Sequence, residues 1–396
     1  MVKIAIITTH IWPAQGYGGV AASASRLVHA WLQSGIQPVV CASDASEGSS
    51  LLAAEVSARY PGASVRLYRA WRFRRWGFGW GAPLRIWQTC SEADVVYVNG
   101  IGTWPCTLGA IFSVFLKKPF VTAVRGGLMP AHVEAIRRYK PHKWLYYRLL
   151  TFPTLRRANA VHVCSPREGD AVRAILPSVR TVTIANGISL PEKVENPERG
   201  PLRICYIGRI SKEKGINAFA REWSNIRQDG EQLWVAGGGT GPYFDEFRRL
   251  AEWGGEAIRY LGEIPPAEVH KVIARSHFLV LPSGLDGGGE RENFGNAVAE
   301  ALAVGRPVLV TRGLAWDHLE EQGIGMTFAC SVESIRAAVD AARVMVGTER
   351  YTEACLAARS FAEQYLSIER TTDELFRLCR RAAEAGPGVA VGEQSE

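Results

Sequence analysis

The chain has 396 residues, 47% of them hydrophobic and 21% charged, which is enough for the cores of two ordinary globular domains. No apolar run reaches the ~20 residues of a membrane-spanning helix, and the eight cysteines form no Cys-x-x-Cys pair, so neither zinc nor a disulfide framework is indicated. The charge is uneven. Residues 1–200 carry 24 Lys+Arg and 11 Asp+Glu, whereas residues 201–396 carry 22 and 28, so we expect the first half to contact an anionic partner.

Strand-like apolar runs alternate with helical patterns along the chain. In the first half we expect a helix at 20–33 and strands at 3–8, 38–41, 94–99, 119–124, 160–165 and 180–185. In the second half we expect strands at 203–207, 233–236, 258–261, 278–281 and 308–311. This alternation predicts an α/β fold with parallel sheets that helices cover on both faces.

A segment rich in proline and charge, at 190–201, predicts the boundary between two domains. We therefore expect an N-terminal Rossmann-like domain at 1–190 and a C-terminal one at 191–366. The pattern is helical again from about 353 to 385. The Gly-rich, acidic residues 386–396 predict a disordered tail.

The most informative motif is the stretch from Glu292 to Glu300, which follows the expected strand at 278–281 and begins a helix near Phe294. Ligands of open α/β sheets bind at the carboxyl ends of strands, and the free N–H groups of a helix N-terminus suit an anion. Glu300 lies in an apolar helical run, where a carboxylate needs a polar partner. The loop before Glu292 also contains Asp286 and Glu290, and either could share its role.

A second basic loop follows the expected strand at 203–207. Arg209 and Lys214 flank a turn at which Gly208 allows close approach, and a helix begins near Ile216. Two cations beside a helix N-terminus suit a diphosphate. Such cations could stabilise the charge that develops on a departing nucleoside diphosphate without a metal.

The glycine-rich segment at 16–21 also fits the dinucleotide pattern Gly-x-Gly-x-x-Ala. We discount that match because the turn from Thr8 is too long for a Rossmann turn and Asp44 is too distant to bind a ribose. Gly18 and Gly19 instead suit a glycine loop that approaches a sugar diphosphate.

Together these motifs resemble the retaining GT-B glycosyltransferases of family 4, also called glycosyl transferases group 1. The matches occur in family order over most of residues 3–385. They are Gly18–Val20, Ala185–Ile188, Gly208–Gly215, Leu261–Ile264 and Glu292–Glu300. The resemblance implies the GT-B fold, with two Rossmann-like domains facing a cleft and a last helix, at 367–385, that returns to the first domain.

The resemblance also implies roles for single residues. Glu292 would contact the donor sugar near the reacting centre. Arg125 stands where many relatives place a histidine beside the transferred sugar, so Glu292 and Arg125 are the catalytic candidates; His132 is a weaker, acceptor-facing one. The expected donor-binding residues are Gly18, Gly19, Arg209, Lys214, Ile264, Phe294, Gly295, Asn296 and Glu300. No metal site and no cofactor are expected.

Two stretches, at 66–87 and 137–157, combine arginines with aromatic residues. Such a mixture suits an anionic membrane surface. A nucleic acid would use the same composition, and an ordinary core stripe with solvated arginines explains it equally well.

We therefore expect a retaining, metal-independent glycosyltransferase that moves a sugar from a UDP- or GDP-sugar to a lipid-linked or envelope-glycan acceptor. Its setting would be the reducing cytoplasm, at the inner face of the cell membrane, with no nucleic-acid partner. Two alternatives stay open. One is a GT-B phosphorylase or epimerase, and the other is an inactive GT-B module that binds membrane or nucleic acid.

Overall fold

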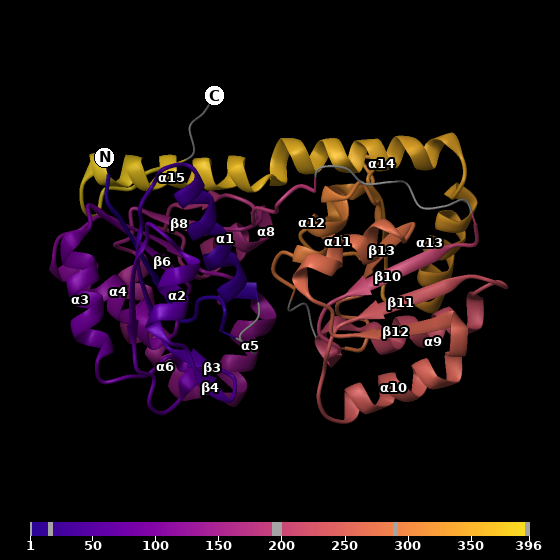
Figure 1. Cartoon of the computed structure of the whole chain (residues 1–396), viewed down its shortest axis with the longest axis horizontal. Coiled ribbons are helices and arrows are strands. Elements are labelled where there is room, and N and C mark those ends of the chain that lie inside the picture. The colour runs from indigo at the N-terminus through magenta and orange to yellow at the C-terminus, as the bar shows by residue number, and fades with distance from the viewer. Residues whose placement is uncertain (1, 15–18, 192–199, 288–291, 393–396) are drawn as a thin grey trace. The chain divides into compact units, whose positions relative to one another are not determined.

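The structure, a computed structural model, describes residues 2–14, 19–191, 200–287 and 292–392. The chain forms two compact units, and Figure 1 colours it from indigo to yellow along the sequence. Unit 1 comprises Met1–Gly187 and Ile368–Glu396, and unit 2 comprises Ile188–Ser367. The first and last parts of the chain therefore fold together.

Unit 1 is built on a seven-stranded parallel sheet in the order β5-β2-β1-β6-β7-β8-β9. The strands are β1 (Ile4–Thr8), β2 (Val39–Ser43), β5 (Ser64–Tyr68), β6 (Val95–Asn99), β7 (Phe120–Ala123), β8 (Ala160–Val163) and β9 (Thr181–Thr183), with a separate short ribbon of β3 (Ala45–Ser46) and β4 (Ser49–Ser50). The five central strands are wholly buried. Helices cover both faces of such a sheet, which is why these strands read as continuous apolar runs.

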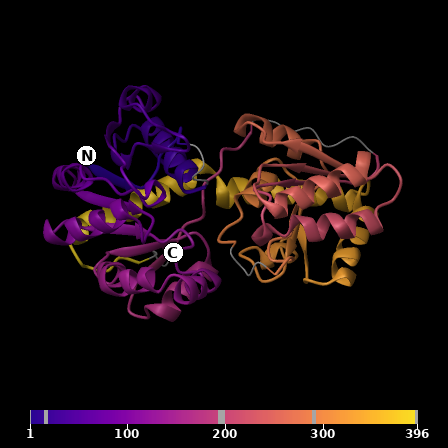
Figure 2. The ribbon, with the colours of Figure 1, turned by 90° about the horizontal axis from the view of Figure 1, so that it is seen from below.

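The α-helices of unit 1 are α1 (Gly19–Gln33), α2 (Ala53–Arg59), α3 (Ala82–Glu92), α4 (Trp104–Phe115), α5 (Pro130–Tyr139), α6 (Pro141–Tyr146), α7 (Phe152–Leu155), α8 (Pro166–Ile175) and α15 (Ile368–Ala385). The yellow helix α15 packs against α1, β6 and β7 (Figure 2). Its Leu378 and Cys379 are fully buried, and Trp31 of α1 donates a hydrogen bond of 3.0 Å to the carbonyl of Thr372. The last helix thus completes the core of unit 1, as the predicted fold class requires.

Unit 2 is built on a six-stranded parallel sheet in the order β12-β11-β10-β13-β14-β15. Its strands are β10 (Arg203–Ile207), β11 (Gln232–Ala236), β12 (Ile258–Gly262), β13 (Phe278–Leu281), β14 (Val308–Thr311) and β15 (Gly325–Phe328). Its α-helices are α9 (Ile216–Ile226), α10 (Pro242–Gly254), α11 (Pro266–Ala274), α12 (Asn296–Ala303), α13 (Val332–Met345) and α14 (Glu349–Phe361). Ser331 and Thr348 cap α13 and α14 by accepting backbone N–H bonds.

Both sheets confirm the predicted α/β fold of two Rossmann-like domains, and every predicted strand is present. In these two sheets the prediction omitted β5 and β15, which are both edge strands with partly exposed residues, and it also omitted the separate short ribbon of β3 and β4. An edge strand lacks the continuous apolar run of a buried one, so the pattern that identified the central strands was absent. The cleft between the domains stays a prediction.

Each sheet has one point at which the strand order reverses. In unit 1, β1 lies between β2 and β6, and in unit 2, β10 lies between β11 and β13. The carboxyl ends of β1 and β6, and of β10 and β13, are therefore the positions at which an open α/β sheet binds its ligand.

The described part of the predicted tail, residues 386–392, contacts the body of unit 1. The side-chain nitrogen of Asn159 donates to the carbonyls of Gly386 and Val389, at 2.7 and 2.6 Å, and the N–H of Val391 donates to the carbonyl of Asn159 at 2.8 Å. These bonds hold the segment beside the start of β8.

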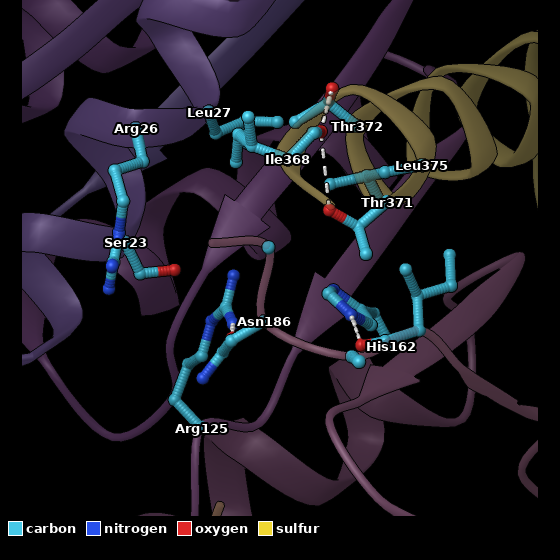
Figure 3. Close-up of a pocket in the computed structure, with 13 residues that line it drawn as sticks. Ser23, Arg26, Leu27, Arg125, His162, Asn186, Ile368, Thr371, Thr372 and Leu375 are labelled. Atoms are coloured by element: carbon cyan, nitrogen blue, oxygen red, sulfur yellow. Dashed lines mark hydrogen bonds between the residues drawn. The ribbon is translucent and has the colours of Figure 1, made fainter. Parts of the chain in front are cut away.

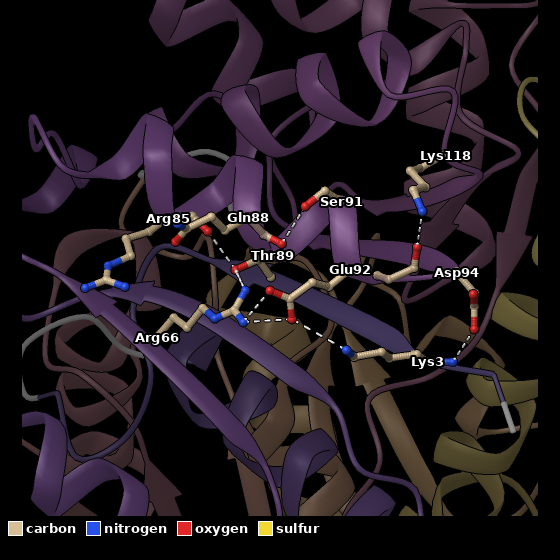
Figure 4. A network of polar contacts seen from close by, with 10 residues as sticks. Lys3, Arg66, Arg85, Gln88, Thr89, Ser91, Glu92, Asp94 and Lys118 are labelled. Atoms are coloured by element: carbon tan, nitrogen blue, oxygen red, sulfur yellow. Dashed lines mark hydrogen bonds and ion pairs between the residues drawn. The ribbon is translucent and has the colours of Figure 1, made fainter.

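The basic aromatic stretch at 66–87 divides between the core and the surface. Arg66 lies in β5 and forms two hydrogen bonds of 2.8 Å to Glu92, which also pairs with Lys3 (Figure 4). Trp76 and Phe78 stack with each other and pack against Trp104. The exposed aromatic residues of the stretch are Trp71, Phe73, Trp80 and Trp87. Within the described residues, no helix is long and apolar enough to cross a bilayer.

Candidate functional site

The loop after β10 carries the two cations that the sequence singled out. Arg209 is 69% exposed and its guanidinium lies 3.3 Å from Glu213, whereas Lys214 is 23% exposed. Although burial opposes it, the backbone N–H of Glu213 and the positive charges of Arg209 and Lys214 lower the pKa of Glu213. Both cations therefore act on one short turn, which ends where α9 begins at Ile216.

The loop after β13 carries the first glutamate of the motif. Glu292 is nearly buried and accepts a hydrogen bond of 3.2 Å from the hydroxyl of Ser283. Phe294 is also buried and packs on Trp316 with ring centroids 5.0 Å apart, and its carbonyl accepts from the indole N–H. This contact fixes the turn that leads through Gly295 into α12, whose first residue is Asn296.

The two loops meet at the point where the strand order of unit 2 reverses. Lys214 forms an ion pair with Glu292, although 78 residues separate them in the chain. Gly215 makes this approach possible, since its φ is +67° and a Cβ there would lie 2.1 Å from the carbonyl oxygen of Pro282. A residue with a side chain would push the loops apart.

The side chain of Tyr206, on β10, interacts with both the loop after β10 and the loop after β13. Tyr206 is fully buried, and its hydroxyl donates a bond of 2.6 Å to the carbonyl of Arg209. Burial and then the carboxylate of Glu292 raise the pKa of Tyr206, while Arg209 acts to lower it. Arg209, Lys214 and Glu292 therefore lie within electrostatic range of the same end of β10.

The structure shows close backbone contacts among Gly208, Gly237 and Gly262 that the sequence analysis did not predict. Gly237 follows β11, with φ +143°, and a Cβ there would lie 1.9 Å from the carbonyl oxygen of Gly208. The N–H of Gly237 donates to the carbonyl of Gly262 at 2.8 Å, so the ends of β10, β11 and β12 touch backbone to backbone. The run of glycines from 237 to 239 was the available signal. Ile264, one of the predicted donor-binding residues, is half-buried just beyond β12.

Asp286, the first alternative to Glu292, makes contacts that stabilise the fold of unit 2. One carboxylate oxygen accepts from the N–H of Ala218 at 3.1 Å and from the hydroxyl of Tyr243 at 2.5 Å. The other oxygen pairs with Arg221 at 2.9 Å. Asp286 thus holds the first turn of α9, where a carboxylate is favourable. The second alternative, Glu290, lies outside the described residues.

The remaining motif residues lie on or beside α12. Glu300 is half-buried in the helix, and Asn296 opens it. No acidic residue lies in the first turn, so the positive end of the helix dipole is not neutralised by a side chain of its own. The side-chain oxygen of Asn293 is buried with no hydrogen-bond partner among the described residues. Such a group next to Glu292 is a further candidate for ligand contact.

In unit 1, Arg125 lies in the left-handed region of φ, at +50°, directly after β7. Its guanidinium donates to Asn99, Tyr97 and Asn186 at 2.8, 3.0 and 2.6 Å, and the nitrogen that donates to Asn186 also lies 3.2 Å from the sulfur of Cys164. The predicted catalytic arginine therefore joins the ends of β6, β8 and β9. Figure 3 shows it beside Asn186 in a small pocket that residues of α1, β8 and α15 also line.

A buried histidine continues this network. The ring of His162 lies 2.8 Å from both the hydroxyl of Tyr97 and the carbonyl of Ile184. A carbonyl can only accept, so Nε2 carries the proton and Nδ1 accepts from Tyr97 in the neutral ring. Burial, followed by the charge of Arg125, lowers the pKa of His162 to about 3.

The glycine loop is only partly described. Gly18 lies outside the described residues, and Gly19 is the first residue of α1. The structure therefore brings Arg209, Lys214, Glu292, Phe294, Gly295 and Asn296 to one end of the unit 2 sheet. Arg125 lies separately in unit 1.

Family models match both units of the chain. A model described as Glycosyl transferases group 1 matches residues 201–346, and one described as Glycosyltransferase Family 4 matches residues 17–191. The two matches cover most of the sheets of unit 2 and unit 1, respectively.

Individual proteins agree with these matches. Glycogen synthase of Mycobacterium tuberculosis is 28% identical over 166 residues, which are 40% of this chain and 38% of the relative. The amylovoran biosynthesis glycosyltransferase AmsK of Erwinia amylovora is 23% identical over 192 residues, 47% of each chain. The chain thus spans less than half the length of these curated relatives.

A solved structure matches almost throughout. HepE of Anabaena, crystallised with UDP, superposes with a TM-score of 0.73 and 15% identity, over 96% of this chain and all of the other. At 15% sequence identity, this match establishes that the chain and HepE share a fold.

Proposed function

The chain belongs to the glycosyltransferases of the GT-B type, and we propose that it transfers a sugar from a UDP- or GDP-sugar to a lipid-linked or envelope-glycan acceptor. The observation that carries this proposal is the meeting of Lys214 and Glu292 at the strand reversal of unit 2. That position unites a cation, a carboxylate and two helix N-termini, which are the groups that a nucleotide-diphosphate sugar requires.

In the proposed complex the donor diphosphate contacts the loop after β10. Arg209 is exposed and Lys214 is partly so, and both can donate charged hydrogen bonds to phosphate oxygens. The first turn of α12 contributes backbone N–H groups and the positive end of its dipole. The close approach of Gly237 to Gly208 fixes the start of the loop that carries both cations.

The carboxylates of the motif bind hydroxyl groups. Glu292 lies beside Lys214, where the last phosphate and the sugar join, so it is assigned to the donor sugar. Glu300 lies two turns into α12 and is assigned to the ribose. Asn293 adds an amide next to Glu292.

We propose transfer with retention of the anomeric configuration. The bond between the anomeric carbon and the diphosphate oxygen breaks, and the acceptor oxygen bonds to that carbon on the same face. The acceptor proton passes to the departing phosphate. Arg209 and Lys214 stabilise the negative charge that develops on the leaving group, so the step uses no metal and no cofactor.

The acceptor is assigned to unit 1, where Arg125 fixes the strand ends around a small pocket. The relative AmsK is named for amylovoran biosynthesis, which supports an envelope glycan as the acceptor class. The predicted contact with an anionic membrane surface suits an acceptor carried on a lipid.

A calorimetric panel of UDP- and GDP-sugars tests this function, followed by incubation of the bound donor with lipid-linked glycans. We expect one nucleotide-sugar to bind and its sugar to appear on an acceptor with the anomeric configuration of the donor. Absence of binding by every member of the panel would refute the proposed activity.

A further inference from the structure

Unit 1 contains a groove whose chemistry no part of the proposed transfer uses. It has a volume of about 430 Å³ and is lined by Arg137, Trp144, Arg148, Phe152, Arg156, Ala174 and Ile175. This volume lies within the usual range of ligand sites. Three of the seven lining residues are arginines and none is acidic, so the groove favours an anion.

The three arginines have no opposite charge of their own. Within the described part of the chain, neither Arg137, Arg148 nor Arg156 forms an ion pair or a side-chain hydrogen bond. Arg137 instead lies over the ring of Trp144, 4.2 Å from its centroid. Like charges that face one groove repel one another, and a bound anion relieves that repulsion.

The local sequence explains how these side chains come together. Trp144, Arg148, Phe152 and Arg156 recur at every fourth position, from α6 through the π-helical turn Tyr147–Thr151 and α7 to the residue that follows α7. Residues four apart lie on the same face of a helix. The rings of Trp144 and Phe152 confirm this, since they pack edge to face with centroids 5.4 Å apart.

The neighbouring column of the same helix is apolar and exposed. Leu145 and Leu149 are 55% and 64% exposed, and Leu150 and Tyr139 are exposed as well. Leu145 and Leu149 directly follow the groove residues Trp144 and Arg148. A helix that presents arginines beside exposed leucines is suited to the boundary between lipid headgroups and acyl chains.

We propose that this groove binds the phosphate headgroup of an anionic lipid, with Leu145 and Leu149 entering the acyl boundary. Guanidinium groups match phosphate oxygens in geometry and charge. The segment 130–157 carries seven Lys+Arg and only one acid, so its field attracts an anionic surface as a whole. The inference rests on the proposed function, because a lipid-linked acceptor would be presented at such a surface.

Co-sedimentation with phosphatidylglycerol-containing vesicles tests the groove in the full-length chain. We compare the variant Arg137→Gln/Arg148→Gln/Arg156→Gln with the matched control Arg138→Gln/Lys140→Gln/Arg157→Gln, which removes the same charge from the same segment outside the groove. Diffuse attraction contributes about fivefold for each charge in either variant, whereas a charged hydrogen bond to a phosphate contributes at least about tenfold, so we expect the groove variant to lose about a thousandfold or more in partition coefficient. We expect the control to lose several times less.

Further measurements distinguish a lipid headgroup in the groove from a free phosphate and from diffuse attraction to the surface. At 0.5 M salt we expect the variant Leu145→Ser/Leu149→Ser to dissociate completely from the vesicles, whereas a fraction of the parent chain stays bound. Salt screens the charges but does not weaken the insertion of apolar side chains. Equal losses in the two arginine variants would overturn the groove as a site and leave only diffuse attraction. If the parent chain does not bind vesicles but binds inorganic pyrophosphate in calorimetry, and the groove variant loses part of that binding, the lipid source would be overturned.

The same preparations distinguish this inference from the proposed function. UDP or GDP binding by unit 2 should be equal in the parent chain and both arginine variants. If the parent binds vesicles through the groove but binds no nucleotide, the proposed function fails while the groove stands.

Discussion

At the scale of single residues, the two acids Asp286 and Glu292, which precede α12, make different contacts. Asp286 accepts from Ala218 and Tyr243 and pairs with Arg221, so its carboxylate is already occupied by the fold. Glu292 pairs with Lys214 beside the strand reversal, where the proposed donor binds. Sequence alone could not separate them, because both lie in one loop and only their contacts differ.

These contacts predict opposite effects for two conservative variants. We expect Asp286→Asn to lower the free energy of unfolding by about 1–3 kcal/mol, since it leaves the cap and the arginine poorly satisfied. Transfer per folded molecule should persist. Glu292→Gln should instead reduce transfer by at least about tenfold, with a smaller loss of stability. Urea unfolding measures the stability of both variants, and a transfer assay measures their activity. A large loss of transfer in Asp286→Asn, with transfer kept in Glu292→Gln, would make Asp286 the donor contact.

Buried histidines predict the pH dependence of unit 1. Burial lowers the pKa of His162 to about 3 and that of His10 to about 4, whereas a histidine in the unfolded chain protonates near pH 6.5. As the pH falls below 6.5 the unfolded chain therefore binds more protons, and the free energy of unfolding should fall. Each histidine contributes up to about 1.4 kcal/mol per pH unit.

Urea unfolding at pH 7.5, 6.5 and 5.5 measures this slope. The control His162→Gln can still donate to Ile184 and accept from Tyr97 but does not titrate, so its slope should be smaller. A stability that stays constant or rises between pH 6.5 and 5.5 contradicts the assignment of a neutral, buried ring.

At the scale of elements, the sequence predicted the buried central strands and the loops after β10 and β13. A parallel strand covered on both faces must be apolar throughout, and this pattern is visible in the chain. The close contact of Gly237 with Gly208 was not predicted, because it depends on how the ends of β10 and β11 pair. Nor could spacing reveal that Arg125 bonds to groups from three strand ends.

This contact predicts a contrast between two glycine variants of unit 2. Gly237→Ala places a Cβ 1.9 Å from the carbonyl oxygen of Gly208, whereas Gly241→Ala meets nothing within 4 Å. Both positions have positive φ, at +143° and +79°, so both variants carry backbone strain of about 1–3 kcal/mol. Gly237→Ala must also displace the loop after β10. We therefore expect it to unfold at a lower urea concentration than Gly241→Ala and to bind the nucleotide more weakly than that variant does. Equal effects would mean that the loops do not depend on this approach.

At the scale of the whole molecule, each unit has its own sheet and its own strand reversal. The last helix belongs to unit 1 although unit 2 precedes it in the chain, so the two units are joined twice. Sequence pattern predicted the alternation of strands and helices, but the return of α15 came only from the family resemblance. Periodicity shows that a helix has an apolar face and does not show which sheet covers that face.

The proposed chemistry of the whole enzyme assigns no role to a metal ion. In the proposed step, Arg209 and Lys214 supply the positive charge that a divalent cation would otherwise bring to the leaving diphosphate. We expect transfer to continue in EDTA at an unchanged rate. A rate that falls to zero and returns only with Mg²⁺ or Mn²⁺ would contradict the metal-free step.

The most direct test of the account is calorimetry of UDP, GDP and the corresponding nucleosides with the parent chain and with Lys214→Met. We expect the variant to lose about 1.5–3 kcal/mol of diphosphate binding, the contribution of one charged hydrogen bond, while nucleoside binding is unchanged. The double variant Lys214→Met/Glu292→Gln, in which no carboxylate is left unpaired, should recover stability without recovering this affinity. Equal affinity of the parent chain and Lys214→Met for both nucleoside diphosphates would contradict the placement of the donor at the junction of Lys214 and Glu292.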